Sequence, residues 1–293
     1  MQRNLTISVF LLPTLVFVVL FIAFPMLYSG YLSLTKFNYA TDTQPTFIGL
    51  KGYINTILHD PFFHIALLNQ IRFAIPYFIL SFLFSLAVAI LLNELKQEVQ
   101  LFQTIFYLPM IIPLSFAGII FAWILAPDFG IFNNFLRILG IENWNIDWFG
   151  NPHTAIYAMV IAQSWKMVGF TIIVFLAGLQ SIPEYLREAA RVDGANFWQE
   201  IFFVVLPNLK PYLLTGGIWI LINSMKVFDL PAAITGGGPG TATLTLYYYS
   251  WKLAFQRLDM GKASQVAYIT AFIILLLSWL WNKMLKPNIA ERR

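Results

Sequence analysis

The side chains that most often carry chemistry are scarce in this chain. It contains no cysteine and only three histidines, which excludes disulfides and thiolate metal sites. His59 and His64 lack the spacing that lets two histidines on one helix share a zinc ion, and His153 stands alone. We therefore expect all three histidines to be ordinary loop residues, and we predict neither a metal site nor a catalytic residue.

A glycine-rich run, Gly236-Gly237-Gly238-Pro239-Gly240, is the next candidate for chemistry. A phosphate-binding loop requires Gly-Lys-Ser/Thr after its glycines, and none follows this run. The later Gly261-Lys262-Ala263 lacks both the upstream glycine and the hydroxyl. We therefore predict no nucleotide and no other cofactor bound to this chain, and a flexible loop is the simplest interpretation of the glycines.

Three polar residues stand inside long apolar stretches. Lys166 carries a charge whose burial in a bilayer is expensive, so it should face protein or a water-filled path. A contact with a transported solute and a structural role, as an ion pair or a snorkelling side chain, both remain open. Gln163 and Asn223 carry amides that need partners inside a membrane. They could contact a polar solute or join one helix to another.

The composition predicts the elements that position these residues. Hydrophobic residues make up 59% of the 293 residues and charged residues only 11%, whereas a soluble domain carries about 25% charged residues. A helix needs about 20 apolar residues to cross a bilayer. The predicted fold class is therefore all-α, a polytopic membrane protein with one transmembrane domain over 1–293. Its six spans are expected at about 9–30, 73–93, 103–125, 155–179, 211–230 and 263–283. The first span is too long for the core of a cleaved signal peptide.

Basic residues near the ends of the spans predict the orientation. A cytoplasmic C-terminus is favoured by Lys283, Lys286, Arg292 and Arg293, and an even number of spans places Arg3 on the same side. Segments 94–98 and 181–210 would then be cytoplasmic, and segments 36–71, 127–153 and 231–262 would face outward. Aromatic residues flank the expected outer ends, as at membrane interfaces: Trp144, Trp148, Tyr247, Tyr248, Tyr249 and Trp251. The net charge of +4 is small and scattered, so no nucleic-acid partner is predicted.

The expected cytoplasmic segment 181–210 combines helix signals with charges. Ser181 and Glu184 have the spacing of a capping box, and Gly194 can adopt the left-handed conformation that ends a helix. A second helix should then run as far as Pro207. The first of these helices has small residues at its centre. It could dock on another protein, or it could lie as an amphipathic helix on the lipid headgroups.

A longer motif in this segment resembles a known family. Glu188-Ala189-Ala190, then Gly194 after three residues, then Val204-Val205-Leu206-Pro207 resembles the EAA signature of binding-protein-dependent ABC importers, whose usual form has isoleucine at the position of Val204. In that family the loop is a coupling helix that sits in a cleft of the cytoplasmic ATPase. The resemblance implies ATPase-coupling roles for Glu188, Ala189, Ala190, Arg191, Asp193 and Gly194.

The resemblance covers essentially the whole chain. Segments 47–50, 108–113, 176–183 and 235–239 resemble the carbohydrate-importer branch, on the side of the maltose- and glycerol-phosphate-type first permease. This implies the transmembrane domain of a type I ABC importer in the cell (inner or plasma) membrane. The chain lacks the large outer-loop insertion and the extra N-terminal helices of the enteric maltose subunit.

The resemblance also implies partners and sites. The expected partners are a second homologous permease, an ABC ATPase dimer that binds the ATP, an extracellular solute-binding protein, and a carbohydrate delivered by it. The implied substrate-binding residues are Gln163, Lys166, Met167, Phe170, Asn223 and Ser224, with Met110, Leu114 and Val227 nearby. The binding protein would dock at Gly236, Gly237, Gly238 and Pro239. The chain itself would be no enzyme, and transport would proceed by alternating access.

Two other classes compete with this prediction. An integral-membrane enzyme, such as a sugar-lipid transferase, would need acidic or histidine clusters at a membrane face, and the sequence shows none with useful spacing. A secondary transporter or channel often shows internal repeats or intramembrane carboxylates, and here Asp229 near the end of a span is the nearest candidate. The coupling-loop motif has no purpose in either class.

Overall fold

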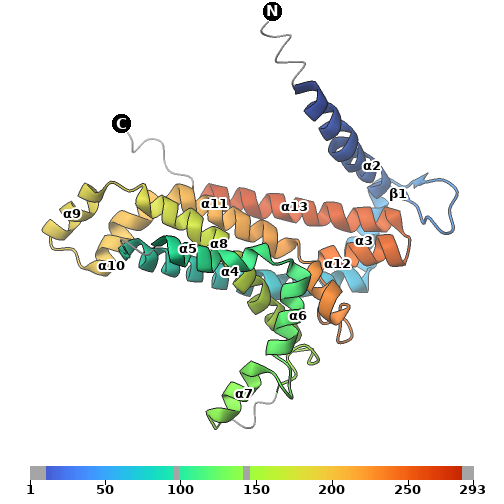
Figure 1. The fold of residues 1–293 in the computed structure, drawn as a ribbon. Helices are drawn as coiled ribbons and strands as arrows, with labels where there is room; N and C mark the ends of the chain where they lie inside the picture. The colour runs from blue at the N-terminus through green and yellow to red at the C-terminus, as the bar shows by residue number, and fades with distance from the viewer. Residues whose placement is uncertain (1–10, 96–98, 141–145, 286–293) are drawn as a thin grey trace, which may run out of the picture. The chain divides into compact units, whose positions relative to one another are not determined.

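The computed structural model describes residues 11–95, 99–140 and 146–285 (Figure 1). Within them the chain is almost entirely helical, which confirms the all-α prediction. The longer helices are Leu11–Ser33, which contains α2 (Phe24–Ser33), then α4 (Pro61–Glu94), α8 (Ala155–Gln180), α11 (Leu206–Met225) and α13 (Met260–Leu285). Arg3, Trp144, Lys286, Arg292 and Arg293, on which the predicted orientation and aromatic belt partly rest, lie outside the described residues.

The shorter elements connect these helices. They are β1 (Thr35–Lys36), β2 (Thr46–Phe47), α3 (Lys51–His59), α5 (Val99–Ile111), α6 (Leu114–Ile124), α7 (Ile131–Ile138), α9 (Glu184–Val192), α10 (Phe197–Gln199) and α12 (Leu246–Trp251). Four π-helical segments join them: η1 (Val19–Ala23), η2 (Glu200–Val205), η3 (Pro231–Thr235) and η4 (Lys252–Gln256). The two strands pair antiparallel, Thr35 opposite Phe47.

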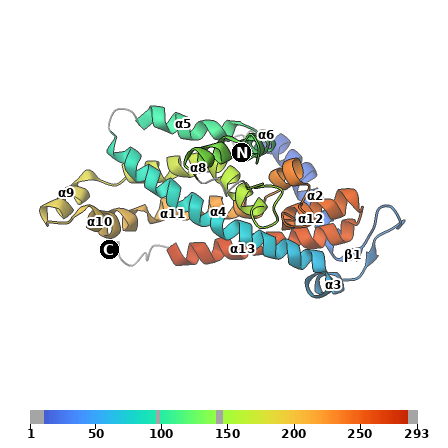
Figure 2. The same cartoon turned by 90° about the horizontal axis from the view of Figure 1, so that it is seen from below.

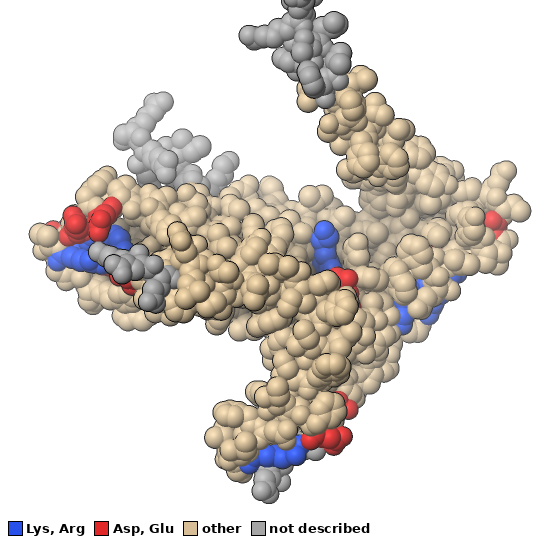
Figure 3. All heavy atoms as spheres, in the orientation of Figure 1, with Lys and Arg blue, Asp and Glu red and all other residues tan. Residues whose placement is uncertain are grey.

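Length and composition identify the helices that can cross a membrane. The described residues contain five that pass both criteria, and six if α5 and α6 together form one broken span. Figure 3 shows large uncharged areas on the face in view, with acidic and basic side chains confined to a few places.

The third predicted span, 103–125, is not one continuous helix. It divides into α5 and α6, which are bent by 99° at a break after Ile111 (Figure 1). Pro113 precedes α6 with an extended ψ of 139°. A proline has no N–H to donate and disfavours a helical conformation in the residue before it, so the helix cannot run straight through this position.

The fifth predicted span, 211–230, is also shifted. Helix α11 ends at Met225, because Lys226 leaves the helical conformation. At the other end the predicted stop at Pro207 is wrong: α11 begins at Leu206 and Pro207 lies in its first turn. Pro207 lies within the continuous helical run Phe197–Met225, so it removes one backbone hydrogen bond without ending the helix. The π-helical segment η2 precedes it, and Leu206 N still donates to Ile201 O.

The chain forms two compact units. The first contains the described part of 1–64 together with 249–271. In this unit Asp60 is a buried carboxylate. It accepts from the Tyr249 hydroxyl at 2.6 Å and from Lys262 Nζ at 2.9 Å. Burial alone would raise the pKa of Asp60, but these two partners hold that pKa below its usual value. Tyr248 and Tyr249, two of the aromatic residues at the expected outer ends, are buried among protein side chains.

The second unit contains the described parts of 65–248 and 272–293. Helix α8 is its central element, and two thirds of its membrane-spanning window is buried. It packs against α5, α6 and α11. Gly169 on α8 permits the closest approach, since a Cβ added there would lie 2.2 Å from the backbone oxygen of Phe106 on α5. The apolar cores of this unit lie along both halves of α8.

Candidate functional site

The predicted coupling loop forms a helix that projects beyond the ends of its neighbours. Figures 1 and 2 both place α9 and α10 past the ends of α8 and α11. Gly194 ends α9 with the predicted left-handed conformation, at φ +84°. Its N–H donates to Arg191 O, and the N–H of Ala195 donates to Ala190 O at 2.9 Å. Five of the six predicted coupling residues are exposed: Glu188, Ala189, Arg191, Asp193 and Gly194; Ala190 is half-buried.

The capping signals of this loop differ from the prediction. Pro183 is the N-cap of α9, so the helix begins at Glu184, two residues too late for a capping box with Ser181. The Ser181 hydroxyl instead donates to Gly178 O at 2.7 Å. The capping box that does form joins Asn196 and Gln199, at the start of α10. The Asn-x-x-Gln spacing was the signal in the sequence that could have revealed it.

An ion-pair cluster behind α9 was not predicted from the sequence. Glu200, which is 3% exposed, accepts from the guanidinium of Arg187 at 2.5 Å and from that of Arg191 at 2.8 Å. Arg187 also donates to Glu94 Oε1, at the end of α4, at 2.7 Å. Figure 3 shows acidic and basic side chains gathered at this end. Burial alone would lower the pKa of Arg187, but its two carboxylate partners raise that pKa above its ordinary value, so the guanidinium stays charged.

Residues at the C-terminal end of α9 and in the segment that follows it line an open groove of about 330 Å³. Its lining residues are Ala190, Asp193, Gly194, Ala195, Gln199, Phe203 and Val204. Small side chains at the floor of the groove let another chain approach the backbone closely, and Asp193 supplies a charge at its edge. Three predicted coupling residues, Ala190, Asp193 and Gly194, therefore meet in one concave surface.

The predicted substrate residues come together on α8 and α11. Gln163 donates to the backbone oxygen of Asn223 at 2.9 Å, and the Asn223 amide donates to Trp219 O within its own helix. The ring centroids of Phe170 and Trp219 are 4.4 Å apart. Gln163 therefore joins the two helices through its amide nitrogen. Its carbonyl oxygen, like Trp219 Nε1 and Thr171 Oγ1, is buried without a hydrogen-bond partner among the described residues.

Lys166 has a structural partner. Its ammonium, in a residue only 6% exposed, donates to the backbone oxygen of Met110 at 2.9 Å. Met110 lies in the last turn of α5, where carbonyls have no helical partner and a cation is favourable. Lys166 therefore stabilises the break between α5 and α6. No carboxylate pairs with it among the salt bridges of the described residues.

The remaining substrate candidates are bonded within their own helix or packed in the core. The Ser224 hydroxyl donates to Leu221 O within its helix, and Val227 is fully buried. Met167 and Leu114 are half-buried and pack against the core around Ile220. The cluster that the structure assembles therefore centres on Gln163, Phe170 and Asn223, with Trp219 as a member that the sequence did not indicate.

The glycine-rich segment is a hydrogen-bonded turn. Gly236, Gly237 and Gly240 have positive φ, and the Gly238-Pro239 peptide bond is cis. The Thr243 hydroxyl donates to Gly238 O at 2.9 Å and lies 2.6 Å from the Thr235 hydroxyl. These bonds close the segment on itself, so it presents a defined turn and not the flexible loop of the simplest interpretation.

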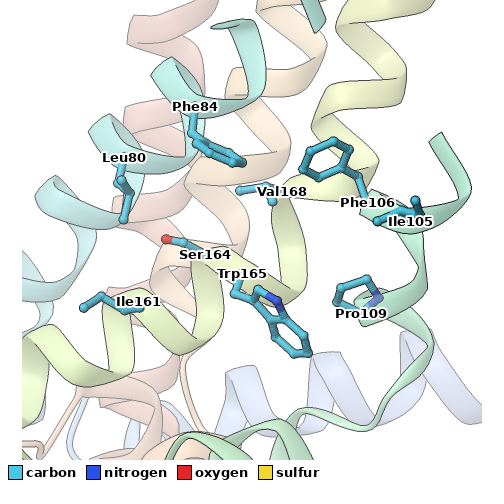
Figure 4. Close-up of a pocket in the computed structure, with 9 residues that line it drawn as sticks. All are labelled: Leu80, Phe84, Ile105, Phe106, Pro109, Ile161, Ser164, Trp165 and Val168. Carbon is cyan, nitrogen blue, oxygen red and sulfur yellow. The ribbon is translucent and has the colours of Figure 1, made fainter. Parts of the chain in front are cut away.

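A cavity of about 320 Å³ lies between α4, α5 and α8 (Figure 4). Its lining is apolar except for the Ser164 hydroxyl and the Trp165 indole N–H: Leu80, Phe84, Ile105, Phe106, Pro109, Ile161, Ser164, Trp165 and Val168. The Ser164 hydroxyl already accepts from Ser81 at 3.1 Å. None of the predicted substrate residues lines this cavity, and its surface offers a sugar few hydrogen bonds.

The described residues contain no group of three or more His, Asp or Glu side chains that could hold a metal ion. The Nε2 atom of His64 lies 2.6 Å from Ile57 O, and His59 is the last residue of α3.

Comparison with protein families shows which family the chain belongs to. The family described as the binding-protein-dependent transport system inner membrane component matches residues 99–289, which include the coupling loop and the α8–α11 cluster. The chain belongs to this family. The predicted family is thereby confirmed, and the chain is a multi-pass membrane permease.

Members of this permease family match the chain over most of its length. The sulfoquinovosyl glycerol transport system permease protein SmoG of Agrobacterium fabrum is 34% identical, over 88% of this chain and 83% of its own. The trehalose/maltose transport system permease protein MalF of Thermococcus litoralis is 30% identical, over 94% of this chain and 91% of its own.

A solved structure shares the fold. It is a bacterial ABC transporter involved in the import of the acidic polysaccharide alginate. It superposes with a TM-score of 0.82 over 98% of this permease and 97% of the matched chain, at 24% identity. This agreement confirms the predicted transmembrane fold of an ABC importer permease.

Proposed function

We propose that this permease is one of two membrane subunits of an ATP-driven sugar importer. The observation that carries the proposal is the coupling loop, a capped helix that projects from the helical body with the EAA residues exposed. The exposed side chains of α9 include Tyr185 and Val192 beside the charged Glu188, a mixture of apolar and charged groups that suits docking on another protein. The sugar is supported by SmoG and MalF, which are named for sugar transport systems.

In this proposal the chain performs no chemistry of its own. An ABC ATPase dimer binds and hydrolyses ATP, a second homologous permease completes the pathway, and an extracellular solute-binding protein delivers the sugar near Gly236 to Pro239. The ATPase moves the coupling helix on the cytoplasmic side, where both termini also lie. The permease contributes by having two conformations whose relative stability the partners change.

The polar atoms without partners on α8 and α11 support a place for the sugar. Gln163 Oε1 is an acceptor, Trp219 Nε1 is a donor, and the half-buried Phe170 and Trp219 rings offer apolar faces. Sugar sites combine such groups. Lys166 is excluded from the proposed contacts, because it is already bonded to the backbone of α5.

Uptake by cells carrying Glu188→Lys tests the transport proposal. We expect the variant to insert into the membrane, to lose the ATPase on purification in mild detergent, and to lose uptake. Glu184→Lys is the matched control, because it reverses the same charge at the first residue of the same helix and should retain both. Uptake that persists in Glu188→Lys cells would instead favour a transporter that works without ATP.

The proposed sugar contacts are tested by kinetics. Gln163→Leu and Phe170→Ala should raise the KM for uptake, each by about tenfold for a lost interaction near 1.4 kcal/mol. Ser164→Ala, in the apolar cavity of Figure 4, should leave KM unchanged. A rise in KM for the cavity variant alone would move the site to the cavity.

A further inference from the structure

The cluster behind the coupling helix joins three parts of the chain that are distant in sequence. Glu94 is the last residue of α4, Arg187 lies on α9, and Glu200 begins η2, which leads into α11. Arg187 bonds both carboxylates, that of Glu94 through Nη2 and that of Glu200 through Nε. The peptide chain already links α9 to α8 and to η2. The Arg187–Glu94 bond adds a link to α4 that the chain does not supply.

Apolar packing beneath the cluster reinforces this link. Ala89 and Leu92 of α4 are buried in the same core as Leu179 and Ile182, which lead into the coupling loop. Leu186 of α9 packs against that core. Two residues of α9 are therefore held from this side: Leu186 by a core to which α4 contributes, and Arg187 by the ion pair with Glu94 of α4.

Helix α4 extends the link toward the proposed sugar site. It runs back from Glu94 as one helix of 34 residues that contains Pro76, about 50 Å long. Along its length Ser85 donates to Val168 O on α8, Ser81 to the Ser164 hydroxyl, and Gln70 to Ser224 O on α11. A displacement of α4 at Glu94 would therefore reach the helices that carry Gln163 and Asn223.

We propose that Glu94 and Arg187 clamp the coupling helix α9 to the end of α4, so that the two helices move as one body during transport. The proposal rests on the proposed transport function. Arg187 is a positioning residue: it acts by fixing the direction in which a movement of α9 is passed on. The Arg191 side chain is 56% exposed, and among the described residues its guanidinium bonds Glu200 alone. Arg191 therefore links α9 to η2 but makes no bond to α4.

The absence of cysteine in the chain gives a direct test. In the assembled, reconstituted transporter, Glu94→Cys with Arg187→Cys removes the clamp, and a short bifunctional thiosulfonate restores it as a reducible covalent link. Without cross-linking we expect sugar moved per ATP to fall about fivefold, within the range by which single substitutions change coupling between sites. Cross-linking should restore the ratio, and reduction should abolish it again.

The matched control is Glu184→Cys with Arg187→Cys. Its two thiols lie on the same face of α9, so the pair also removes the clamp, but its cross-link cannot rejoin α4. We expect it to lose coupling and to show no recovery after cross-linking. Recovery in the control would overturn the proposal, and so would unchanged coupling in the uncross-linked Glu94→Cys, Arg187→Cys pair.

Two further readouts separate the clamp from the transport function. Cross-linking of positions 94 and 187 should go to completion equally with and without bound ATP, whatever solute is carried. Loss of cross-linking in one of these states would show that the helices separate and would refute the clamp. Absence of ATP-dependent sugar uptake in the cysteine-free parent would count against the proposed function instead.

Discussion

The contact between α5 and α8 at Gly169 provides the sharpest prediction for stability and transport. A Cβ at this position would lie 2.2 Å from the backbone oxygen of Phe106 and 2.9 Å from Tyr107 Cα. Ordinary contact begins near 3.4 Å, so Gly169→Ala requires the two helices to separate by about 1 Å. No rotamer change can relieve the clash, because the atoms that it meets belong to the backbone.

The cost has two parts. Overpacking of this kind costs about 1–3 kcal/mol. A separation of about 1 Å would also stretch the 2.9 Å bond from Lys166 to Met110 O beyond hydrogen-bonding distance. The Met110 carbonyl and the Lys166 ammonium would then no longer be hydrogen-bonded at the end of α5. We expect Gly169→Ala to melt several degrees lower in detergent and to lose most of its uptake.

Gly118→Ala on α6 is the control. Its added Cβ would meet the terminal atoms of Ile234 and Leu230 side chains at 2.8–3.1 Å, which can move aside. Thermal unfolding of both purified variants, followed by tryptophan fluorescence, distinguishes the two cases. If Gly169→Ala melts within 1 °C of the parent, about the error of the assay, the close approach of α5 and α8 is refuted.

Three further predictions concern the loops. Glu200→Gln should weaken the hold of Arg187 on η2 by about 2 kcal/mol, so amide exchange in α9 should quicken by about 30-fold; unchanged exchange would contradict the cluster. Gly194→Ala should lower the stability of the loop by about 1 kcal/mol. The cost is backbone strain alone, because nothing lies within 4 Å of an added Cβ. Gly194→Asn should recover much of this stability, and equal losses in thermal melting would argue against the left-handed turn. Asp60→Asn should cost about 3 kcal/mol by leaving Lys262 unpaired. Since the folded-state pKa of Asp60 lies below 3.8, its contribution is complete above pH 3.8 and is lost as the pH falls further; the melting temperature of the parent should drop there, and that of Asp60→Asn should change less.

Signals that act within a few residues were predictable from the sequence. Gly194 adopts the expected left-handed conformation because only the local backbone determines it. The apolar runs predicted the long helices for a similar reason. In a membrane each run must hydrogen-bond its own backbone N–H and C=O groups, which a helix does within the segment. Pro113 was equally visible, but a proline can kink, cap or break a helix, and only the packing of α6 against η3 and α8 selects the break.

Contacts between distant segments could not be predicted. The partner of Lys166 is a backbone oxygen, and a backbone oxygen has no sequence signature. Nothing in the sequence relates Glu94, at the end of α4, to Arg187, in the middle of α9, and the two meet only in the folded chain. The pair of Ser181 and Glu184 failed because Pro183 fixes where α9 begins. The resemblance to a permease family supplied the roles of the residues, and the structure supplied their partners.

The position of α8 among its neighbours also bears on how the protein is made. Helix α8 carries Lys166 and Gln163, and its mean hydropathy is lower than that of α4, so releasing it into lipid alone costs more than releasing α4. The ribosome completes α4 and α5 before α8. The partners of Ser164 and Lys166, Ser81 and Met110, are therefore already in the bilayer when α8 emerges. Only Gln163 must wait for α11. The order of the chain thus allows a helix with a buried lysine and a buried amide to leave the insertion machinery directly onto helices that already hold partners for it.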